Sequence, residues 1–276
     1  MIPAAFDYER ASSIDEAIQL LDQHGEDAKL IAGGHSLLPL MKLRLARPTV
    51  LVDIERIDEL SYVRDGGDHL EVGALTRMYQ VADDPVLKEH CGLLAYAAGQ
   101  VGDPQVRHRA TLGGSVAHGD PASDPPCVLL TLDATFVARG PSGDREIPAG
   151  QFFTSLFETA LQPDEVLTAI RVPKLGGAGW SYQKFHRRAI DWAIVGVAAV
   201  GPNGSGPRVG LTNMGMTPLR AAGVEQALAG GADARSAAEH APDGTSPPSD
   251  TNASDEYRRE LSKVLVRRAL EEAIGR

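Results

Sequence analysis

The chain has 276 residues, of which 43% are hydrophobic and 23% charged, and its formal net charge is −10. This length is enough for one large or two ordinary domains. The acidic balance argues against a broad nucleic-acid surface, because such a surface needs a basic stripe. An acidic protein can still bind an anionic cofactor through backbone amides.

The cysteines and the hydropathy exclude further classes. Cys91 and Cys127 form no CxxC pair and no zinc or iron–sulfur spacing. Residues 1–7 lack the basic and apolar regions of a signal peptide. The longest apolar run, at 193–200, is far shorter than the roughly 20 residues of a membrane span. We therefore expect a cytoplasmic protein without a metal site or a membrane span.

The first predicted elements follow from helix caps and apolar periodicity. Ser13–Glu16 has the pattern of a capping box, and Gly25 is placed to end the helix that follows. A short apolar strand at 29–31 precedes Gly33-Gly34 and a helix at 37–45. The other elements predicted before residue 110 are strands at 49–54 and 69–75, a short helix capped by Thr76, and a longer helix at 85–98.

The rest of the chain predicts an α+β fold, not a doubly wound sheet. Asp124 before Pro125-Pro126 is typical of a helix N-cap. A glycine-rich stretch at 173–179 marks the expected boundary between domains 1–175, with subdomains of about 1–55 and 56–175, and 179–276. The remaining predicted elements are strands at 134–139, 145–147, 166–172, 180–185, 193–200 and 208–216, a hairpin turn at 202–206, a helix from 217 to about 229, a loop at 230–254, and an amphipathic helix at 257–274 with Leu261, Val264, Leu265 and Leu270 inward.

Two Gly-Gly pairs carry the main chemical signal. Gly33-Gly34 and Gly113-Gly114 are each closely followed by a serine, Ser36 and Ser115. Glycine allows a positive φ and lets a ligand approach the backbone, so two such turns can hold one diphosphate from two sides. Glycines kept only for packing, and serines that cap a helix or turn, remain equally open interpretations. The Rossmann GxGxxG, the P-loop, HExxH, GxSxG and SxxK patterns are absent from the sequence.

The segments 32–39 and 111–124 resemble the flavin-binding subunits of molybdenum hydroxylases, most of all the medium subunits of aerobic carbon monoxide dehydrogenases. The resemblance covers nearly the whole chain. It implies the FAD-binding fold of the vanillyl-alcohol oxidase type, with two α+β subdomains that hold noncovalent FAD. It also implies a C-terminal α+β domain with a three-stranded antiparallel sheet.

The resemblance implies a set of cofactor contacts and no catalytic residue. The residues that it assigns to FAD are Ala32, Gly33, Gly34, His35, Ser36, Leu37, Val101, Gly102, Thr111, Gly113, Gly114, Ser115, His118, Asp124, Leu167, Lys184 and Trp192.

Several of these assignments have a plain structural alternative. Asp124 can be a helix N-cap only, and Lys184 a solvated lysine on an edge strand. Trp192 stands where relatives often carry tyrosine, and it either covers the flavin or packs in a domain core. His35 and His118 can act as acid or base, or can simply form local hydrogen bonds.

The resemblance also implies a division of labour among subunits. A molybdenum large subunit would oxidise the substrate, and an iron–sulfur small subunit with 2Fe–2S clusters would pass electrons to FAD here. An external, quinone-like acceptor would then reoxidise the flavin. Two cysteines cannot ligate a cluster, which agrees with this scheme. We expect the three subunits to form a dimer of heterotrimers. The partner subunits can associate this chain with the inner face of the membrane.

Three alternatives stay open. The chain can be a self-contained FAD oxidoreductase, or the FAD subunit of a sibling hydroxylase that acts on xanthine, another N-heterocycle or an aldehyde. It can also be a noncatalytic binding or assembly module.

Overall fold

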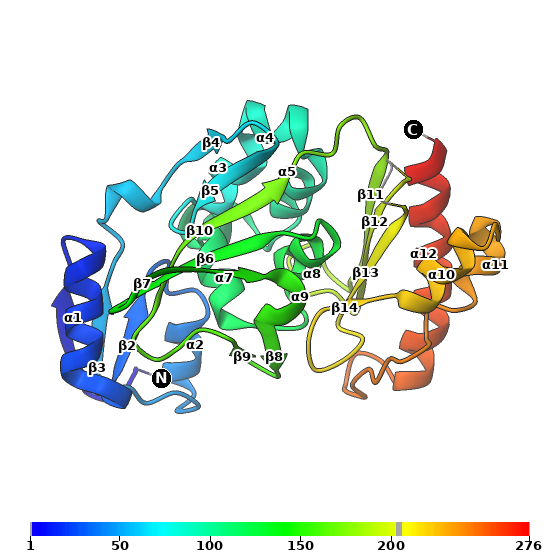
Figure 1. The fold of residues 1–276 in the computed structure, drawn as a ribbon. Coiled ribbons are helices and arrows are strands. Elements are labelled where there is room, and N and C mark those ends of the chain that lie inside the picture. Colours follow the sequence, from blue (N-terminus) through cyan, green and yellow to red (C-terminus); the bar gives the residue numbers. More distant parts are fainter. Residues whose placement is uncertain (1, 203–205, 276) are drawn as a thin grey trace.

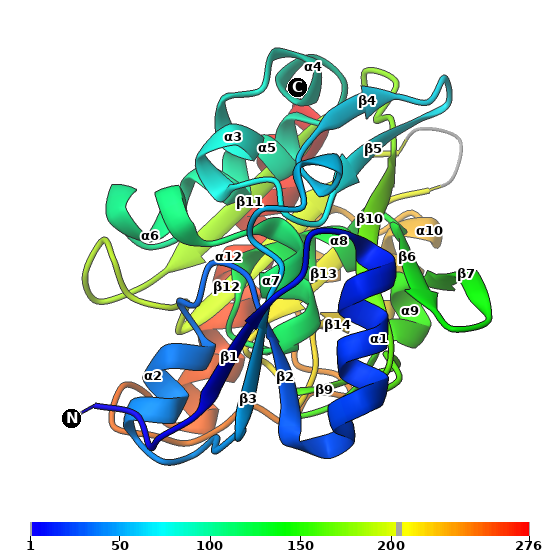
Figure 2. The same ribbon diagram turned by 90° about the vertical axis from the view of Figure 1, so that its left-hand side faces the viewer.

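The computed structural model describes residues 2–202 and 206–275. A small parallel sheet begins the fold, with strand order β1-β3-β2. Figure 2 looks onto this sheet, with one helix on each side. Its elements are β1 (Asp7–Arg10), α1 (Ile14–His24), β2 (Ala28–Ile31), α2 (Leu37–Lys42) and β3 (Val50–Asp53), with a 3₁₀ turn at Gly25–Asp27.

Local sequence explains where α1 and α2 begin and end. Ser13 caps α1 by accepting from the Glu16 N–H, and Gly25 ends the helix with φ 55°. The Glu16 carboxylate accepts from Ser12, not from the cap residue, so the capping box is only half formed. The predicted helix 37–45 is too long, because Arg44 adopts φ 64°, which ends the α-helical path.

A five-stranded antiparallel sheet forms the middle of the molecule, in the order β4-β5-β10-β6-β7 (Figure 1). The long central strand β10 pairs with β5 on one side and with β6 on the other. Phe136 and Phe152 pack together beside it in the main core, with their rings tilted by 51° and the ring centroids 4.3 Å apart. The strands are β4 (Val63–Asp65), β5 (His69–Gly73), β6 (Thr135–Gly140), β7 (Gly143–Pro148) and β10 (Val166–Pro173), with a small hairpin of β8 (Phe153–Ser155) and β9 (Glu158–Thr159).

The helices around this sheet are shorter than the sequence predicts. The predicted helix 85–98 is two helices, because Cys91 at φ −147° breaks it. Thr76 does not cap a helix; its hydroxyl and the backbone of Tyr62 exchange hydrogen bonds instead. The helices are α3 (Met78–Asp83), α4 (Pro85–His90), α5 (Gly92–Gly99), α6 (Pro104–Arg109), α7 (Leu112–His118), α8 (Asp124–Thr131) and α9 (Ala149–Phe152), with a 3₁₀ turn at Asp58–Leu60.

The C-terminal sheet is antiparallel, in the order β11-β12-β13-β14, and it lies between α8 and the long α12 (Figure 1). At Gly210 in β13, an added Cβ would lie 3.0 Å from the Cys127 sulfur on α8. This close approach packs the sheet onto the preceding part of the chain. The elements are β11 (Trp180–Phe185), β12 (Val195–Val200), β13 (Arg208–Thr212), β14 (Leu219–Arg220), α10 (Ala222–Ala229), α11 (Ala234–Ala238) and α12 (Asp255–Gly275).

Three expectations for this region are corrected by the structure, and a fourth includes residues that the structure does not describe. A two-residue fourth strand, β14, occupies the predicted helix start at 217–221, because the chain pairs with β13 before α10 begins. The predicted loop 230–254 contains α11, which Asp233 caps. Val264 is 39% exposed, so its predicted inward position is wrong. The predicted hairpin turn at 202–206 includes residues 203–205, which lie outside the described ranges. Among residues 2–202 and 206–275, no helix has the length and apolarity to cross a membrane.

Candidate functional site

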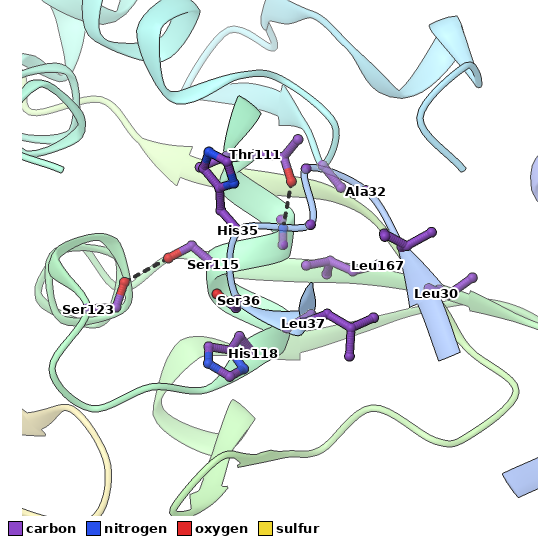
Figure 3. A pocket seen from close by; sticks show the side chains of 18 of the residues that line it. Leu30, Ala32, His35, Ser36, Leu37, Thr111, Ser115, His118, Ser123 and Leu167 are labelled. Carbon is purple, nitrogen blue, oxygen red and sulfur yellow. Dashed lines mark hydrogen bonds between the residues drawn. The ribbon is translucent and has the colours of Figure 1, made fainter. Parts of the chain in front are cut away.

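A cavity of about 970 Å³ lies between the N-terminal sheet, α7 and the loop that joins β11 to β12. Every residue that the sequence assigned to the cofactor lines this cavity. Its size lies at the upper end of the usual range for small-molecule and cofactor pockets. Segments far apart in the chain therefore meet at one place, and Figure 3 shows several of them around the same space.

The first glycine segment follows β2 directly. Gly34 has φ +73°, a conformation that favours glycine, and its carbonyl accepts from the Leu38 N–H at 3.0 Å. Ser36 precedes α2, yet within the described residues its hydroxyl makes no capping bond. Ser36 therefore holds the N-cap position of α2, but its side chain does not cap the helix. The Ser36 residue lines the same cavity as His118 and Ser115 (Figure 3).

The second glycine pair is not a turn, because Gly113 and Gly114 lie in the first turn of α7. Thr111 caps this helix by accepting from the Gly114 N–H at 3.1 Å (Figure 3). The Ser115 hydroxyl is 2.8 Å from the Ser123 hydroxyl. Both serines line the cavity, and α7 supplies one of its walls.

Close packing brings the two glycine segments together. A Cβ on Gly33 would overlap the carbonyl oxygen of Arg109, and one on Gly113 would lie 2.5 Å from the Ala74 Cβ. The packing interpretation of these glycines is thus true, and the same residues also line the cavity. The absence of side chains serves both roles, since it lets the backbones approach each other and leaves space beside them.

A charged cluster fixes the segment on which Gly33 packs. Both guanidinium Nη atoms of Arg109 donate to the Glu55 carboxylate, at 2.6 and 2.9 Å. Arg77 donates to the same carboxylate at 2.8 Å and to the Arg109 carbonyl. This paired geometry holds the carbonyl against Gly33 and leaves little freedom in the spacing of the two segments.

A buried ion pair closes another side of the cavity. The Lys184 ammonium donates to Asp124 at 2.7 Å and to the Gln100 carbonyl at 3.0 Å, and both charged side chains are 5% exposed. The Tyr182 hydroxyl donates to the other Asp124 oxygen at 2.5 Å. Burial raises the pKa of the Asp124 carboxyl, an effect that Lys184 opposes. Asp124 is the first residue of α8, not its N-cap, and Lys184 is not solvated, so both plain alternatives are wrong.

Aromatic and histidine side chains line the rest of the cavity. Trp192 is 66% exposed, which contradicts packing in a domain core. His118 stacks on Phe157, with ring centroids 5.0 Å apart, and burial lowers the pKa of its imidazole. His35 is exposed and also lines the cavity.

Several lining residues were missed by sequence reasoning. Ser123 stands directly before Asp124, and its spacing from Ser115 gave no signal of their contact. Phe157 adopts φ 57° in the turn between β8 and β9, a conformation that no residue type there predicts. The other lining residues not anticipated include Leu30, Asp103, Val106, Ala117, Glu158, Thr159, Gln162, Ile190 and Asp191.

The two cysteines are buried thiols. Burial raises the pKa of Cys91 to about 12 and that of Cys127 to about 11. Among residues 2–202 and 206–275, no cluster of three or more His, Cys, Asp or Glu side chains is placed to hold a metal ion.

We expect neither thiol to react with iodoacetamide at neutral pH in the folded chain, because the thiolate is the reactive form. Both should react once the chain is unfolded in urea. Mass spectrometry of the alkylated protein measures this, and rapid alkylation of the folded chain would contradict the burial of the thiols.

Comparisons with known proteins now identify the class. Residues 4–175 match the family described as the FAD binding domain in molybdopterin dehydrogenase, and residues 180–273 match the CO dehydrogenase flavoprotein C-terminal domain. The chain therefore belongs to the family of FAD-binding subunits of molybdopterin dehydrogenases, which confirms the resemblance seen in the sequence.

The individual relatives are similar along their whole length. The chain is 42% identical over 285 residues to the carbon monoxide dehydrogenase medium chain of Hydrogenophaga pseudoflava, covering 100% of this chain and 99% of the relative. A solved structure of that organism's carbon monoxide dehydrogenase, lacking the Mo-pyranopterin moiety, superposes with a TM-score of 0.95 over 99% of this chain and 98% of that one. The 6-hydroxypseudooxynicotine dehydrogenase subunit alpha of Paenarthrobacter nicotinovorans is 36% identical over 286 residues, covering 100% and 97%.

Proposed function

We propose that the chain binds FAD noncovalently in the cavity and that its two glycine segments hold the diphosphate from opposite sides. The observation that carries this proposal is the packing of Gly33 on the Arg109 carbonyl, directly before the second segment. Backbone amides and the hydroxyls of Ser36 and Ser115 supply donors for the diphosphate. The family matches at 4–175 and 180–273 support a division of the chain into an FAD-binding and a C-terminal domain.

In the proposed scheme FAD supplies the redox chemistry, and the residues of this chain hold and surround it. Lys184 presents a cation at the cavity wall, with Asp124 and the Gln100 carbonyl fixing its position. Trp192 offers an exposed aromatic face to the flavin ring. His35, His118, Val101, Gly102 and Leu167 complete the proposed contacts.

The chain acts, in this proposal, as the flavoprotein subunit of an aerobic carbon monoxide dehydrogenase. A molybdenum large subunit oxidises the substrate, an iron–sulfur small subunit delivers electrons to FAD, and a quinone-like carrier removes them. Full-length identity of 42% to a carbon monoxide dehydrogenase medium chain favours this assignment. The second candidate is the FAD subunit of a hydroxylase for an N-heterocycle, which the 36% identity to a 6-hydroxypseudooxynicotine dehydrogenase subunit supports.

The test compares the chain purified alone with the complex purified from the native host. We expect the chain purified alone to release FAD on denaturation and to show no turnover with CO and a dye acceptor. The complex purified from the native host should contain molybdenum and iron–sulfur subunits and should turn over CO. Robust CO oxidation by the lone chain would contradict the division of labour, and a colourless protein without flavin would contradict the FAD site. Turnover of an N-heterocycle in place of CO would establish the second candidate.

A further inference from the structure

Asn213 contacts one wall of the cavity through its backbone. It directly follows β13 and adopts φ 61°, where asparagine is among the few side chains that fit readily. Its backbone N–H donates to the Pro121 carbonyl at 2.8 Å. Pro121 lies in the segment between α7 and α8, which carries Ser123 to the cavity. The backbone of Asn213 thereby holds the segment between α7 and α8 through a residue close to the cavity lining.

The side chain of Asn213 contacts a second segment of the cavity wall. Its amide nitrogen donates to the Ala193 carbonyl at 2.8 Å and lies 3.4 Å from the Ile194 carbonyl. Ala193 and Ile194 are 2% and 6% exposed, and they directly follow Trp192, which is 66% exposed at the cavity. One residue therefore ties the Trp192 segment to the segment that carries Ser123.

A buried arginine on α12 binds the same stretch of chain that follows Trp192. Arg258 is 1% exposed, and its guanidinium donates to the Ile194 carbonyl and, at 2.8 Å, to Asp250. The Ile194 N–H donates to the Phe185 carbonyl at 2.7 Å, which closes the hairpin behind Trp192. The chain just after Trp192 is therefore held on β11 and α12, and the Asn213 bond links it to the segment that carries Ser123.

We propose that Asn213 is a positioning residue that sets the distance between the Trp192 and Ser123 walls and so tunes the affinity for the flavin ring. This inference rests on the proposed FAD site. Two properties of asparagine are needed at this position. It tolerates the positive φ, and its amide donates to backbone carbonyls. Glycine keeps the first property and loses the second, while aspartate presents an acceptor to two carbonyl oxygens.

The experiment uses the full chain with Trp180→Phe, so that Trp192, the other of the two tryptophans, alone reports binding. Flavin-free protein is titrated with FAD and, separately, with ADP, which offers the diphosphate without the flavin ring. We expect Asn213→Gly to raise the Kd for FAD about fivefold, from loss of one neutral hydrogen bond. Asn213→Asp should raise it further. The Kd for ADP should stay within about twofold.

The outcomes separate the inference from the proposed function. FAD affinity unchanged in Asn213→Gly would overturn the positioning role. Equal weakening of FAD and ADP would also overturn it, because Asn213 would then serve the fold alone. A parent protein that binds no FAD would overturn the proposed function itself. If Asn213→Asp fails to fold, Asn213→Gly still decides, because glycine accepts the backbone conformation.

Discussion

Alanine at Gly33 is expected to lower the free energy of unfolding by about 1–3 kcal/mol, the usual cost of overpacking, and to weaken FAD binding at least about tenfold. The added Cβ would overlap the Arg109 carbonyl oxygen and lie 2.8 Å from its carbon. These are backbone atoms, which cannot rotate away, and the Glu55 cluster holds them in place. The two glycine segments must then move apart. Urea unfolding and FAD titration measure the two effects.

Gly150→Ala is the matched control for this substitution. Gly150 lies in α9, its φ is not in the left-handed region, and a Cβ there would meet no atom within 4 Å. We expect this variant to be neutral, or stabilised by up to about 1 kcal/mol, with unchanged FAD affinity. If Gly33→Ala behaved like Gly150→Ala, the contact between the two segments would not be what forms the site.

Methionine at Lys184 is expected to cost about 3–5 kcal/mol of stability at neutral pH, because it leaves the Asp124 charge buried without its cation. Asp124 keeps the Tyr182 hydroxyl as its other partner, which does not neutralise the charge. The double variant Lys184→Met/Asp124→Asn should lose less than the sum of the two single variants, because the two side chains interact directly. Urea unfolding of all three variants measures this coupling.

The loss in Lys184→Met should depend on pH in a defined direction. Burial raises the pKa of Asp124, and removal of the ammonium that opposes this effect raises it further. A carboxyl whose pKa is raised in the folded state favours folding when protonated, and this contribution is lost as the pH rises through the folded pKa. The variant should therefore lose less stability at about pH 5 than at about pH 8.

An exposed ion pair provides the control for Lys184. Lys88 is 53% exposed and lies 3.2 Å from Asp83, so Lys88→Met should cost less than about 1 kcal/mol. A loss in Lys184→Met that is equally small and independent of pH would show that the Asp124 charge does not need its buried partner.

The cavity residues that could be predicted are those that lie in short, recognisable sequence patterns. Two glycine pairs and a serine near each are visible in short segments, and the family resemblance extended them to residues such as Lys184 that line the same cavity. Most strands were also predicted to within a few residues, because apolar alternation is a local property. The second glycine pair was misplaced, since a cap at Thr111 turns the predicted bend into the start of a helix.

What the sequence could not predict depends on partners far apart in the chain. Asp124 beside two prolines looks like a helix cap, and only its contact with Lys184, 60 positions away, shows otherwise. Asn213 falls inside the predicted strand 208–216, yet β13 ends at Thr212, and the bond of Asn213 to Ala193 is formed across the C-terminal sheet. The break at Cys91 was missed, although glycine, a poor helix former, directly follows it as Gly92, the first residue of α5.

Most of the cavity lining comes from stretches near residues 21–40, 74–78, 101–124, 157–167 and 184–192. During synthesis the ribosome releases the last of these stretches long after the first. A growing chain thus has no complete binding place until the hairpin of β11 and β12 has emerged and joined its earlier neighbours. Flavin loading must consequently wait until translation of the chain is well past its midpoint.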